Sequence, residues 1–478
     1  MGIGCIAPWN RKARLWLEGR KEIFPHIRAA LGPGWPFGPD GIPVPESSVV
    51  PGGGKDGPAG HGDGIATAPA DGAGESPASG AIPGGGHQGG AIPAPGPGEK
   101  RPVIWMHCAS LGEFEQGRPV LEQLRRQSPH CRIVVSFFSP SGYEARKNYT
   151  GADHIFYLPL DSGRNARQLI DLVRPTLVIW IKYDYWYYYL QELKKRNIPT
   201  LLVSGIFRTD QPFFRWYGRV HRYMLECFTH LFVQTENSQK LLGRLGITGN
   251  VTISGDTRFD RVIEIAETPG SLPFIETFCG DHPVIVAGSS WEEDEEELDH
   301  YANTHPELRF IIAPHEIEEG RLREVEALFR HAIRYSEWVK GKVPQDRRSG
   351  QHAGWPAPNV LIIDNIGMLS RLYKYATITY VGGGFGDDGV HNVLEAAVYG
   401  RPVVMGPVIE KYIEAVELAD CGGAIVIDSA LEAESVFDRL LNDPEEYRQT
   451  CEAARNYVYA KRGATSTIVG YVQANRLL

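Results

Sequence analysis

The amino-acid sequence predicts an α/β protein with two Rossmann-like domains, each a doubly wound parallel sheet, that face each other across a central cleft. Short apolar runs alternate with helical segments from residue 101 onward, and such alternation is typical of a parallel sheet. A second alternating series begins at Pro283. The length of 478 residues allows roughly two to four domains, each with its own core.

The predicted strands are apolar and rich in β-branched residues. In the first series they are residues 103–106, 132–138, 176–181, 200–206, 230–235 and 251–255. Helical segments are expected between them, at 115–127, 163–173 and 237–244. The second series comprises strands 284–288, 309–314, 359–364, 377–383, 401–406 and 423–427. The boundary between the domains is expected at 263–280, which gives a first domain of residues 100–270 and a second of 271–478.

Composition excludes several classes of protein. The net charge of −9 argues against a nucleic-acid-binding protein. Seven cysteines without a CxxC pair favour thiols in a reducing cytoplasm over a disulfide framework or a zinc site. No run of 18 apolar residues is present, so no membrane-spanning helix is expected. We therefore predict a soluble or peripheral cytoplasmic protein.

Two segments precede the first domain. Residues 11–31 predict one basic amphipathic helix, interrupted near Pro25, that either packs on the domain or lies at a membrane surface. Residues 32–99 contain 21 Gly and 13 Pro among 68 residues. Such a composition cannot offset the entropy of ordering by burial, and we predict a disordered, flexible insertion.

Glu113 is the first candidate for chemistry. The strand at 103–106 runs into the small-residue turn at 109–112, which brings Glu113 to the start of a helix. A carboxylate there lies at the C-terminal edge of a parallel sheet, where open α/β folds bind ligands. It is suited to accept a proton from a bound hydroxyl. The alternative is a first-turn Glu that only complements the helix dipole.

The second domain carries a glycine-rich turn between a strand and a helix. Gly382, Gly383 and Gly384 allow the backbone to approach a ligand closely. We expect a helix to begin near His391-Asn392, with Asn392 as its cap and its free N–H groups facing a phosphate. Glu395, one turn further, is expected within reach of a ribose. The acidic run at 292–299 is predicted to be a solvated helix face.

Nine motifs, in order along residues 101–470, resemble those of the 3-deoxy-D-manno-octulosonic acid (Kdo) transferases of lipopolysaccharide biosynthesis, which are inverting enzymes of the GT-B fold. They are WMHCASLGE (105–113), VSFFSPSGYE (135–144), YLPLD (157–161), SGDTRFD (254–260), IIAPHE (311–316), DNIGMLSRLY (364–373), YVGGGF (380–385), HNVLEAA (391–397) and GRPVVMGP (400–407). The helix at 11–31 also matches this family, whereas the insertion at 32–99 does not.

The resemblance implies transfer of Kdo from CMP-Kdo to the lipid A precursor, without a metal or another cofactor. Glu113 would be the general base, and Arg258, where the family usually has Lys, would stabilise charge in the transition state. The first domain would bind the acceptor and the second the donor. The donor-binding residues implied by the family are Pro314, His315, Ile366, Gly367, Met368, Asn392, Val393, Leu394 and Glu395.

The chain departs from the family in places that concern the site. Lys182 stands where the family commonly has a Glu with a stabilising role, and Asp184 stands at the position of a second Glu, so Asp184 is the remaining candidate for that acidic role. The usual Pro-Arg-His of the donor site is Pro314-His315-Glu316. The apolar membrane segment of the family is missing or truncated before Pro8.

Two further interpretations remain open. One is a GT-B enzyme that uses a UDP-sugar, and the other is a catalytically silent sugar-nucleotide-binding protein. Two aromatic stretches, at 183–189 and 213–219, contain Tyr, Trp and Arg, which suit a lipid headgroup boundary. Ordinary core packing is expected to account for about half of them. With the helix at 11–31, they predict peripheral binding at the cytoplasmic face of the bacterial inner membrane.

Overall fold

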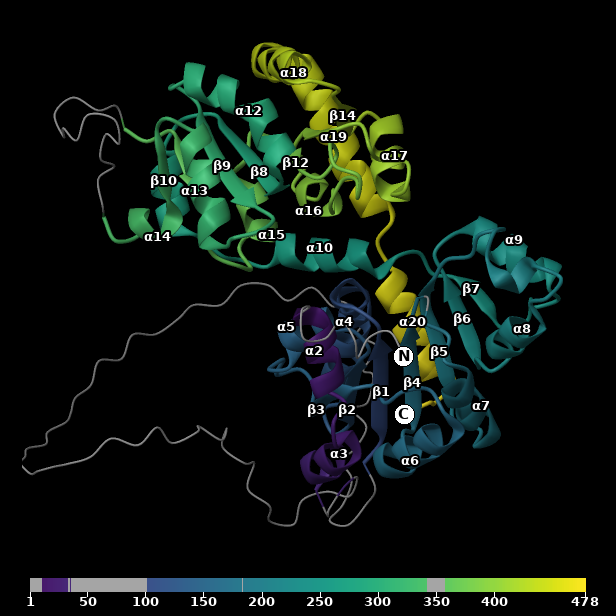
Figure 1. The fold of residues 1–478 in the computed structure, drawn as a ribbon. Helices are drawn as coiled ribbons and strands as arrows, with labels where there is room; N and C mark the ends of the chain where they lie inside the picture. The colour runs from purple at the N-terminus through teal and green to yellow at the C-terminus, as the bar shows by residue number, and fades with distance from the viewer. Residues whose placement is uncertain (1–10, 33–34, 36–100, 183, 342–356) are drawn as a thin grey trace, which may run out of the picture.

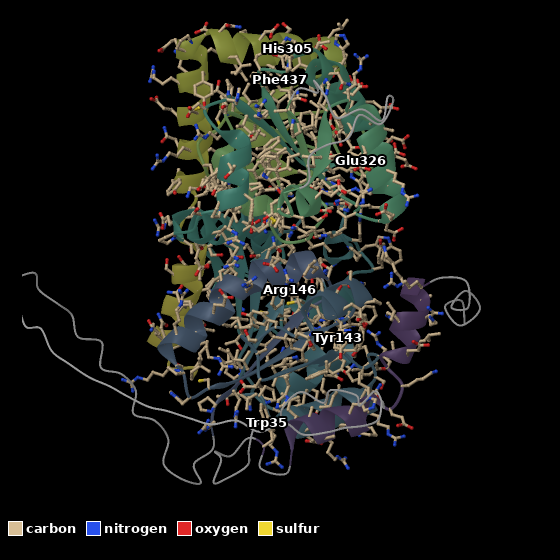
Figure 2. All side chains as sticks on the ribbon, turned by 90° about the vertical axis from the view of Figure 1, so that its left-hand side faces the viewer. Trp35, Tyr143, Arg146, His305, Glu326 and Phe437 are labelled. Carbon is tan, nitrogen blue, oxygen red and sulfur yellow. The ribbon has the colours of Figure 1, made fainter. Side chains whose placement is uncertain are left out.

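The computed structural model describes residues 11–32, 35, 101–182, 184–341 and 357–478. Most of the predicted insertion at 32–99 therefore lies outside the described residues. Figure 1 shows two α/β halves, with helix α10 running between them. The prediction of two Rossmann-like domains with parallel sheets is confirmed: each half contains a seven-stranded sheet whose strands all pair in parallel.

The first sheet has the strand order β3-β2-β1-β4-β5-β6-β7. Its strands are β1 (Val103–Cys108), β2 (Arg132–Phe137), β3 (His154–Tyr157), β4 (Leu177–Ile181), β5 (Thr200–Gly205), β6 (His230–Val233) and β7 (Val251–Ile253). Strand β3 was not among the predicted strands. Its helices are α4 (Leu111–Gln127), α5 (Pro140–Arg146), α6 (Gly163–Val173), α7 (Tyr187–Lys195), η1 (Pro212–Phe214), α8 (Arg219–Leu225) and α9 (Glu236–Arg244).

The second sheet has the strand order β10-β11-β9-β8-β12-β13-β14. Its strands are β8 (Val284–Ser290), β9 (Arg309–Pro314), β10 (Ala332–Arg334), β11 (Val360–Ile362), β12 (Ile378–Val381), β13 (Val403–Met405) and β14 (Ala424–Val426). Strand β10 was not predicted. The helices are α11 (Pro273–Cys279), α12 (Glu292–Thr304), α13 (Glu319–Leu328), α14 (Tyr335–Trp338), α15 (Leu369–Leu372), η2 (Tyr373–Tyr375), α16 (Leu394–Ala397), α17 (Ile413–Asp420), α18 (Ala430–Asn442) and α19 (Pro444–Ala460).

Two helices connect the domains in ways that the sequence boundary at residue 270 does not anticipate. Helix α10 (Thr257–Glu267) contacts α4 of the first domain, yet its residues Phe259 and Val262 pack in the core of the second. Helix α20 (Ala464–Ala474) returns to the first domain, where Ile468 and Val469 join the core beside β1 and β4. The end of the chain is therefore part of the first domain's core.

The N-terminal segment forms two helices, α2 (Arg11–Glu18) and α3 (Ile23–Leu31), and not one. The break precedes Pro25, because Glu22 adopts a left-handed conformation and Pro25 lies in the first turn of α3, where proline is tolerated. Ile23 and Ile27 are buried in the core of the first domain. Of the two expectations for this segment, packing on the domain is the one observed. No helix among the described residues is long and apolar enough to cross a membrane.

Candidate active site

The site lies where both sheets change the direction of their strand order. In the first sheet that point is between β1 and β4, and in the second it is between β8 and β12. Connections on the two sides of such a point leave in opposite directions, which opens a crevice at the carboxyl ends of the strands. The loops after β1, β4, β8 and β12 border this crevice, and further side chains of the site follow β7, β9, β11 and β13.

Glu113 occupies the third position of helix α4, directly after the loop that leaves β1. The helix begins at Ser110, whose hydroxyl accepts a hydrogen bond from the Glu113 backbone N–H. In return, Glu113 Oε2 accepts a hydrogen bond from the Ala109 N–H at 2.5 Å. This exchange is a variant of the capping box, and it fixes the carboxylate at the edge of the sheet. Glu113 is buried, with 8% of its surface exposed.

Lys182 and Arg258 lie together with carboxylates from both domains. Asp256 accepts hydrogen bonds from the Arg258 backbone N–H at 2.9 Å and from Arg258 Nε at 2.8 Å. Arg258 Nη1 donates to Glu414 Oε1 of the second domain at 2.6 Å. Burial lowers the pKa of Lys182 and so does Arg258, whereas Asp256, Glu414 and Glu113 act in the opposite direction. The structure thus brings the predicted residues Lys182 and Arg258 together at one cavity, and the charge of Glu113 acts on Lys182.

Asp184 has a different set of neighbours. Its Oδ2 lies 3.9 Å from His107 Nε2, which also accepts a hydrogen bond from Trp186 Nε1 at 3.2 Å. His107 Nδ1 is 2.9 Å from Ser136 Oγ. Burial lowers the pKa of His107, although Asp184 partly opposes the shift. Asp184 therefore borders a buried polar group inside the first domain.

The glycine loop of the second domain is held by an acidic side chain. Asp294 Oδ2 accepts hydrogen bonds from the backbone N–H of Gly383 at 2.7 Å and of Trp291 at 2.9 Å. Asp294 and Glu295 are both buried. The expectation that the run at 292–299 forms a solvated face is therefore wrong for these two residues, because they bind buried donors of neighbouring loops and strands.

Three rings stack at the carboxyl edge of the second sheet. The His315 ring lies 4.5 Å from both the Trp291 and the His391 rings, at interplanar angles of 24° and 15°. Trp291 Nε1 donates a hydrogen bond to His391 Nε2 at 2.9 Å. Burial, and then the neighbouring His315, lower the pKa of His391 to about 4. His391 is therefore a neutral hydrogen-bond acceptor at pH 7.

The predicted donor residues around Asn392 form a loop and a short helix. Helix α16 begins at Leu394 and has four residues, so the expected helix start at His391-Asn392 is wrong. Asn392 does not cap it: its Nδ2 donates to Glu395 Oε1 at 2.9 Å. Val393 and Leu394 are buried, and their side chains belong to the core of the domain. Burial raises the pKa of Glu395, and Glu115 of helix α4 adds to the shift from across the cleft.

The other predicted donor residues lie on neighbouring loops. Pro314 is the last residue of β9. Ile366 is 87% exposed, Gly367 has a φ of 94°, which favours glycine, and Met368 precedes the first turn of α15. Helices α15 and α16, which follow these loops, both contact α10, the helix that contains Arg258.

A cavity of about 510 Å³ opens between the domains beside this cluster. Its walls include Lys182, Asp256 and Arg258 from the first domain and its connection to α10, and Glu414 from the second. None of the predicted donor-binding residues lines it. Within the described part of the chain, no group of three or more His, Cys, Asp or Glu side chains is arranged to hold a metal ion.

Several residues of the site were not predicted. Glu414 reaches Arg258 from a position 156 residues further along the chain, and no local pattern marks it. Asp256 lies within the SGDTRFD motif, two residues before Arg258, so the motif itself was a usable signal. Trp291 directly follows β8 at the switch point, and its place beside the other edge loops was also available from the strand pattern.

Comparison with known proteins agrees with this geometry. Residues 87–261 match the model of a family described as 3-deoxy-D-manno-octulosonic-acid transferase. The 3-deoxy-D-manno-octulosonic acid transferase of Haemophilus influenzae is 26% identical over 384 residues, which are 77% of this chain and 85% of the relative. That of Chlamydophila psittaci is 27% identical over 367 residues, which are 72% and 78% of the two chains.

Among solved structures, UDP-GlcNAc 2-epimerase from Neisseria meningitidis bound to UDP-GlcNAc superimposes with a TM-score of 0.56. The likeness covers 78% of this chain and 100% of the epimerase, at 16% sequence identity, and it shows the shared fold. The two parallel sheets on either side of a cleft have the GT-B fold. The similarity to these transferases makes the chain a glycosyltransferase of that fold.

Within that class the chain is a relative of the Kdo transferases, over about three quarters of its length. The resemblance predicted from its motifs is thereby confirmed.

Proposed function

We propose that this enzyme transfers Kdo from CMP-Kdo to the lipid A precursor, lipid IVA, with inversion at the anomeric carbon, in lipopolysaccharide core biosynthesis. The observation that carries the proposal is the pair of cations, Lys182 and Arg258, at the cavity between the domains, with Glu113 near enough to act on the charge of Lys182. This arrangement matches the needs of glycosyl transfer: a base for the acceptor and positive charge for the departing phosphate.

In the proposed reaction Glu113 accepts the proton of the acceptor hydroxyl. The acceptor oxygen forms a bond to the anomeric carbon of Kdo while the bond from that carbon to the CMP phosphate breaks. Attack on the face opposite the leaving phosphate inverts the anomeric carbon. Arg258 stabilises the negative charge that develops on the phosphate, and because Asp256 and Glu414 hold its guanidinium on both sides, it needs little rearrangement. Glu113, held at the start of α4 by the Ala109 N–H, is the proposed base, and Asp184, beside His107, is the alternative.

The second domain would hold the donor nucleotide at its switch point. The candidate residues are Pro314, His315, Ile366, Gly367, Met368, Asn392, Val393, Leu394 and Glu395. Asn392 Oδ1 is buried and has no hydrogen-bond partner among the residues that the structure describes, and such an atom is suited to bind a ligand donor. Val393 and Leu394 would contribute backbone groups, since their side chains are in the core.

Membrane binding, in this proposal, is peripheral and takes place at the cytoplasmic face of the inner membrane. The apolar side of α3 packs against the first domain, which leaves the aromatic stretch at 213–219 as the stronger candidate. There Trp216 is 91% exposed and Tyr217 is 56% exposed, whereas Phe213 is buried. Sedimentation with anionic vesicles should weaken in a Trp216→Ser, Tyr217→Ser variant at unchanged turnover of a detergent-dispersed acceptor. Equal sedimentation of the variant and the parent would contradict this surface.

The test of the activity is incubation of the purified enzyme with CMP-Kdo and lipid IVA. CMP release that depends on lipid IVA, together with a product heavier by one or more Kdo units, supports the proposal. Transfer from a UDP-sugar instead, or binding of nucleotide without turnover, would replace it with one of the two alternatives. For the donor site, Glu395→Ala should raise the KM for CMP-Kdo roughly ten- to a hundred-fold, far more than that for lipid IVA.

A further inference from the structure

Lys182 is in an unusual place for a lysine. It follows the last residue of β4, at the switch point of the first sheet, and it lines the 510 Å³ cavity between the domains. Its φ of 56° lies in the left-handed region, which costs a residue with a Cβ roughly 1 kcal/mol or more. Its backbone N–H donates to the Val203 carbonyl at 3.1 Å, which anchors this conformation to β5. Backbone strain of this kind is found preferentially at ligand sites.

Lys182 lines the cavity together with several other charged side chains. Arg258 is hydrogen-bonded to both Asp256 and Glu414, so these three side chains form one connected ion network. Lys182 and Glu113 both lie beside this network, close enough that Glu113 acts on the ammonium of Lys182. The site thus presents two neighbouring cations. The guanidinium is hydrogen-bonded to Asp256 and Glu414, and the ammonium lines the same cavity as these carboxylates, with Glu113 also near enough to favour its charged form.

The donor of the proposed reaction carries two negatively charged groups. One is the phosphate of CMP, and the other is the carboxylate of the octulosonic acid. In a 2-ulosonic acid the carboxyl carbon is bonded directly to the anomeric carbon, so the carboxylate lies next to the reacting bond. Any protein cation that binds it must lie beside the base that activates the acceptor. Lys182 is the described lysine that meets this condition, because it lines the cavity and interacts with Glu113.

We propose that the Lys182 ammonium binds the carboxylate of the sugar acid that is being transferred. This inference rests on the proposed Kdo transfer, and it makes Lys182 a residue that distinguishes an acidic ketose from a neutral sugar. Binding involves no covalent change at Lys182. The ammonium would offset the carboxylate's loss of water through a charge-assisted hydrogen bond.

The test compares the whole donor with its nucleotide. In Lys182→Met, the KM for CMP-Kdo should rise roughly ten- to a hundred-fold, since a charge-assisted hydrogen bond is lost. The Kd for CMP, which lacks the sugar acid, should stay within about two-fold in the same titration. Lys182→Arg should recover most of the loss, because the guanidinium also binds a carboxylate. Lys195→Met, the same substitution at an exposed position of α7, is the control and should change neither constant.

Three outcomes would overturn the inference. An unchanged KM for CMP-Kdo in Lys182→Met would show that the ammonium does not bind the donor. An equal weakening of CMP and CMP-Kdo would assign Lys182 to the nucleotide, and a rise confined to the KM for lipid IVA would assign it to the acceptor. If Lys182→Met does not fold, the comparison of CMP-Kdo with CMP is made in Lys182→Gln. A parental enzyme that does not turn over CMP-Kdo contradicts the proposed function itself, whereas an active parent with an unaffected Lys182→Met contradicts only the carboxylate assignment.

Discussion

Replacement of Glu113 by Gln tests whether the carboxylate at the start of α4 is the base. The substitution keeps the size of the side chain and retains an oxygen that accepts the Ala109 N–H, while it removes the ability to take up a proton. We expect the variant to fold with a loss of about 1 kcal/mol or less, because the local hydrogen bond is preserved. CMP should bind with an unchanged Kd, since Glu113 belongs to the first domain and the proposed nucleotide residues to the second.

The expected effect on the rate follows from the role of a base. General base catalysis contributes about 10²–10⁴-fold, equivalent to about 2.7–5.4 kcal/mol in the barrier. Because Glu113 also takes part in capping α4, part of any loss could come from a frayed helix. Ser110→Ala separates the two roles: it removes the cap of the same helix, at a cost of about 1 kcal/mol in stability, and leaves the carboxylate in place.

The assay is CMP release from CMP-Kdo in the presence of lipid IVA, followed across pH. Glu113→Gln should lower turnover at least about a hundred-fold and abolish the fall in rate at acidic pH, because the group whose protonation stops the reaction is gone. Ser110→Ala should keep that acid limb, and so should Asp184→Asn. The reasoning is refuted if Glu113→Gln retains near-parental turnover while Asp184→Asn loses it, because the base would then be Asp184.

Three further variants or measurements test other parts of the site. Arg258→Met should destabilise the fold by about 2–4 kcal/mol, because it leaves the buried Asp256 and the half-buried Glu414 without their cation. Burial alone raises the pKa of Asp256, but Arg258 brings it below its usual value near 3.9. The ion pair therefore stabilises the fold above about pH 4, and this contribution is lost as the pH falls through the pKa of Asp256 in the folded protein. In urea unfolding, the difference in stability between the parent and Arg258→Met should be larger at pH 7 than at pH 3. A histidine NMR titration should show His391 with a midpoint near 4. The free energy of unfolding should decrease as the pH falls from about 6.5 towards 4, because the histidine of the unfolded chain binds its proton at the higher pH. A midpoint between 6 and 7 would contradict the buried stack. Gly384→Ala should lower the free energy of unfolding by about 1–3 kcal/mol, because its Cβ would lie 2.6 Å from the Gly406 backbone nitrogen. Gly386→Ala is the control, since its Cβ would meet its nearest neighbour at 3.7 Å. Equal thermal stability of the two variants would contradict the close approach of these loops.

Local patterns in the sequence were sufficient for most of the strands. A strand buried on both faces of a parallel sheet is a continuous apolar run, and the twelve predicted runs all appear in the two sheets. Strands β3 and β10 were missed because each lies at the edge of its sheet and is only partly apolar, as in His154–Tyr157. The position of Glu113 at the start of a helix was also readable, because Ser110 three residues earlier is a local capping signal.

The tertiary structure decided which charged side chains meet. Arg258 and Glu414 are 156 residues apart, and only the approach of α17 to the start of α10 brings them together. The same holds for Lys182 and Asp184: a single residue separates them in the sequence, yet Lys182 lines the cavity between the domains and Asp184 borders the buried His107. Lys182 adopts a left-handed backbone conformation directly after β4. The apolar pattern that predicts a strand is a property of near neighbours along the chain, so the sequence by itself determined the strands of the two sheets. The energy of an ion pair depends on the distance between its two charges in space. The pairing of charged side chains was therefore decided only by the packing of the two domains against α10.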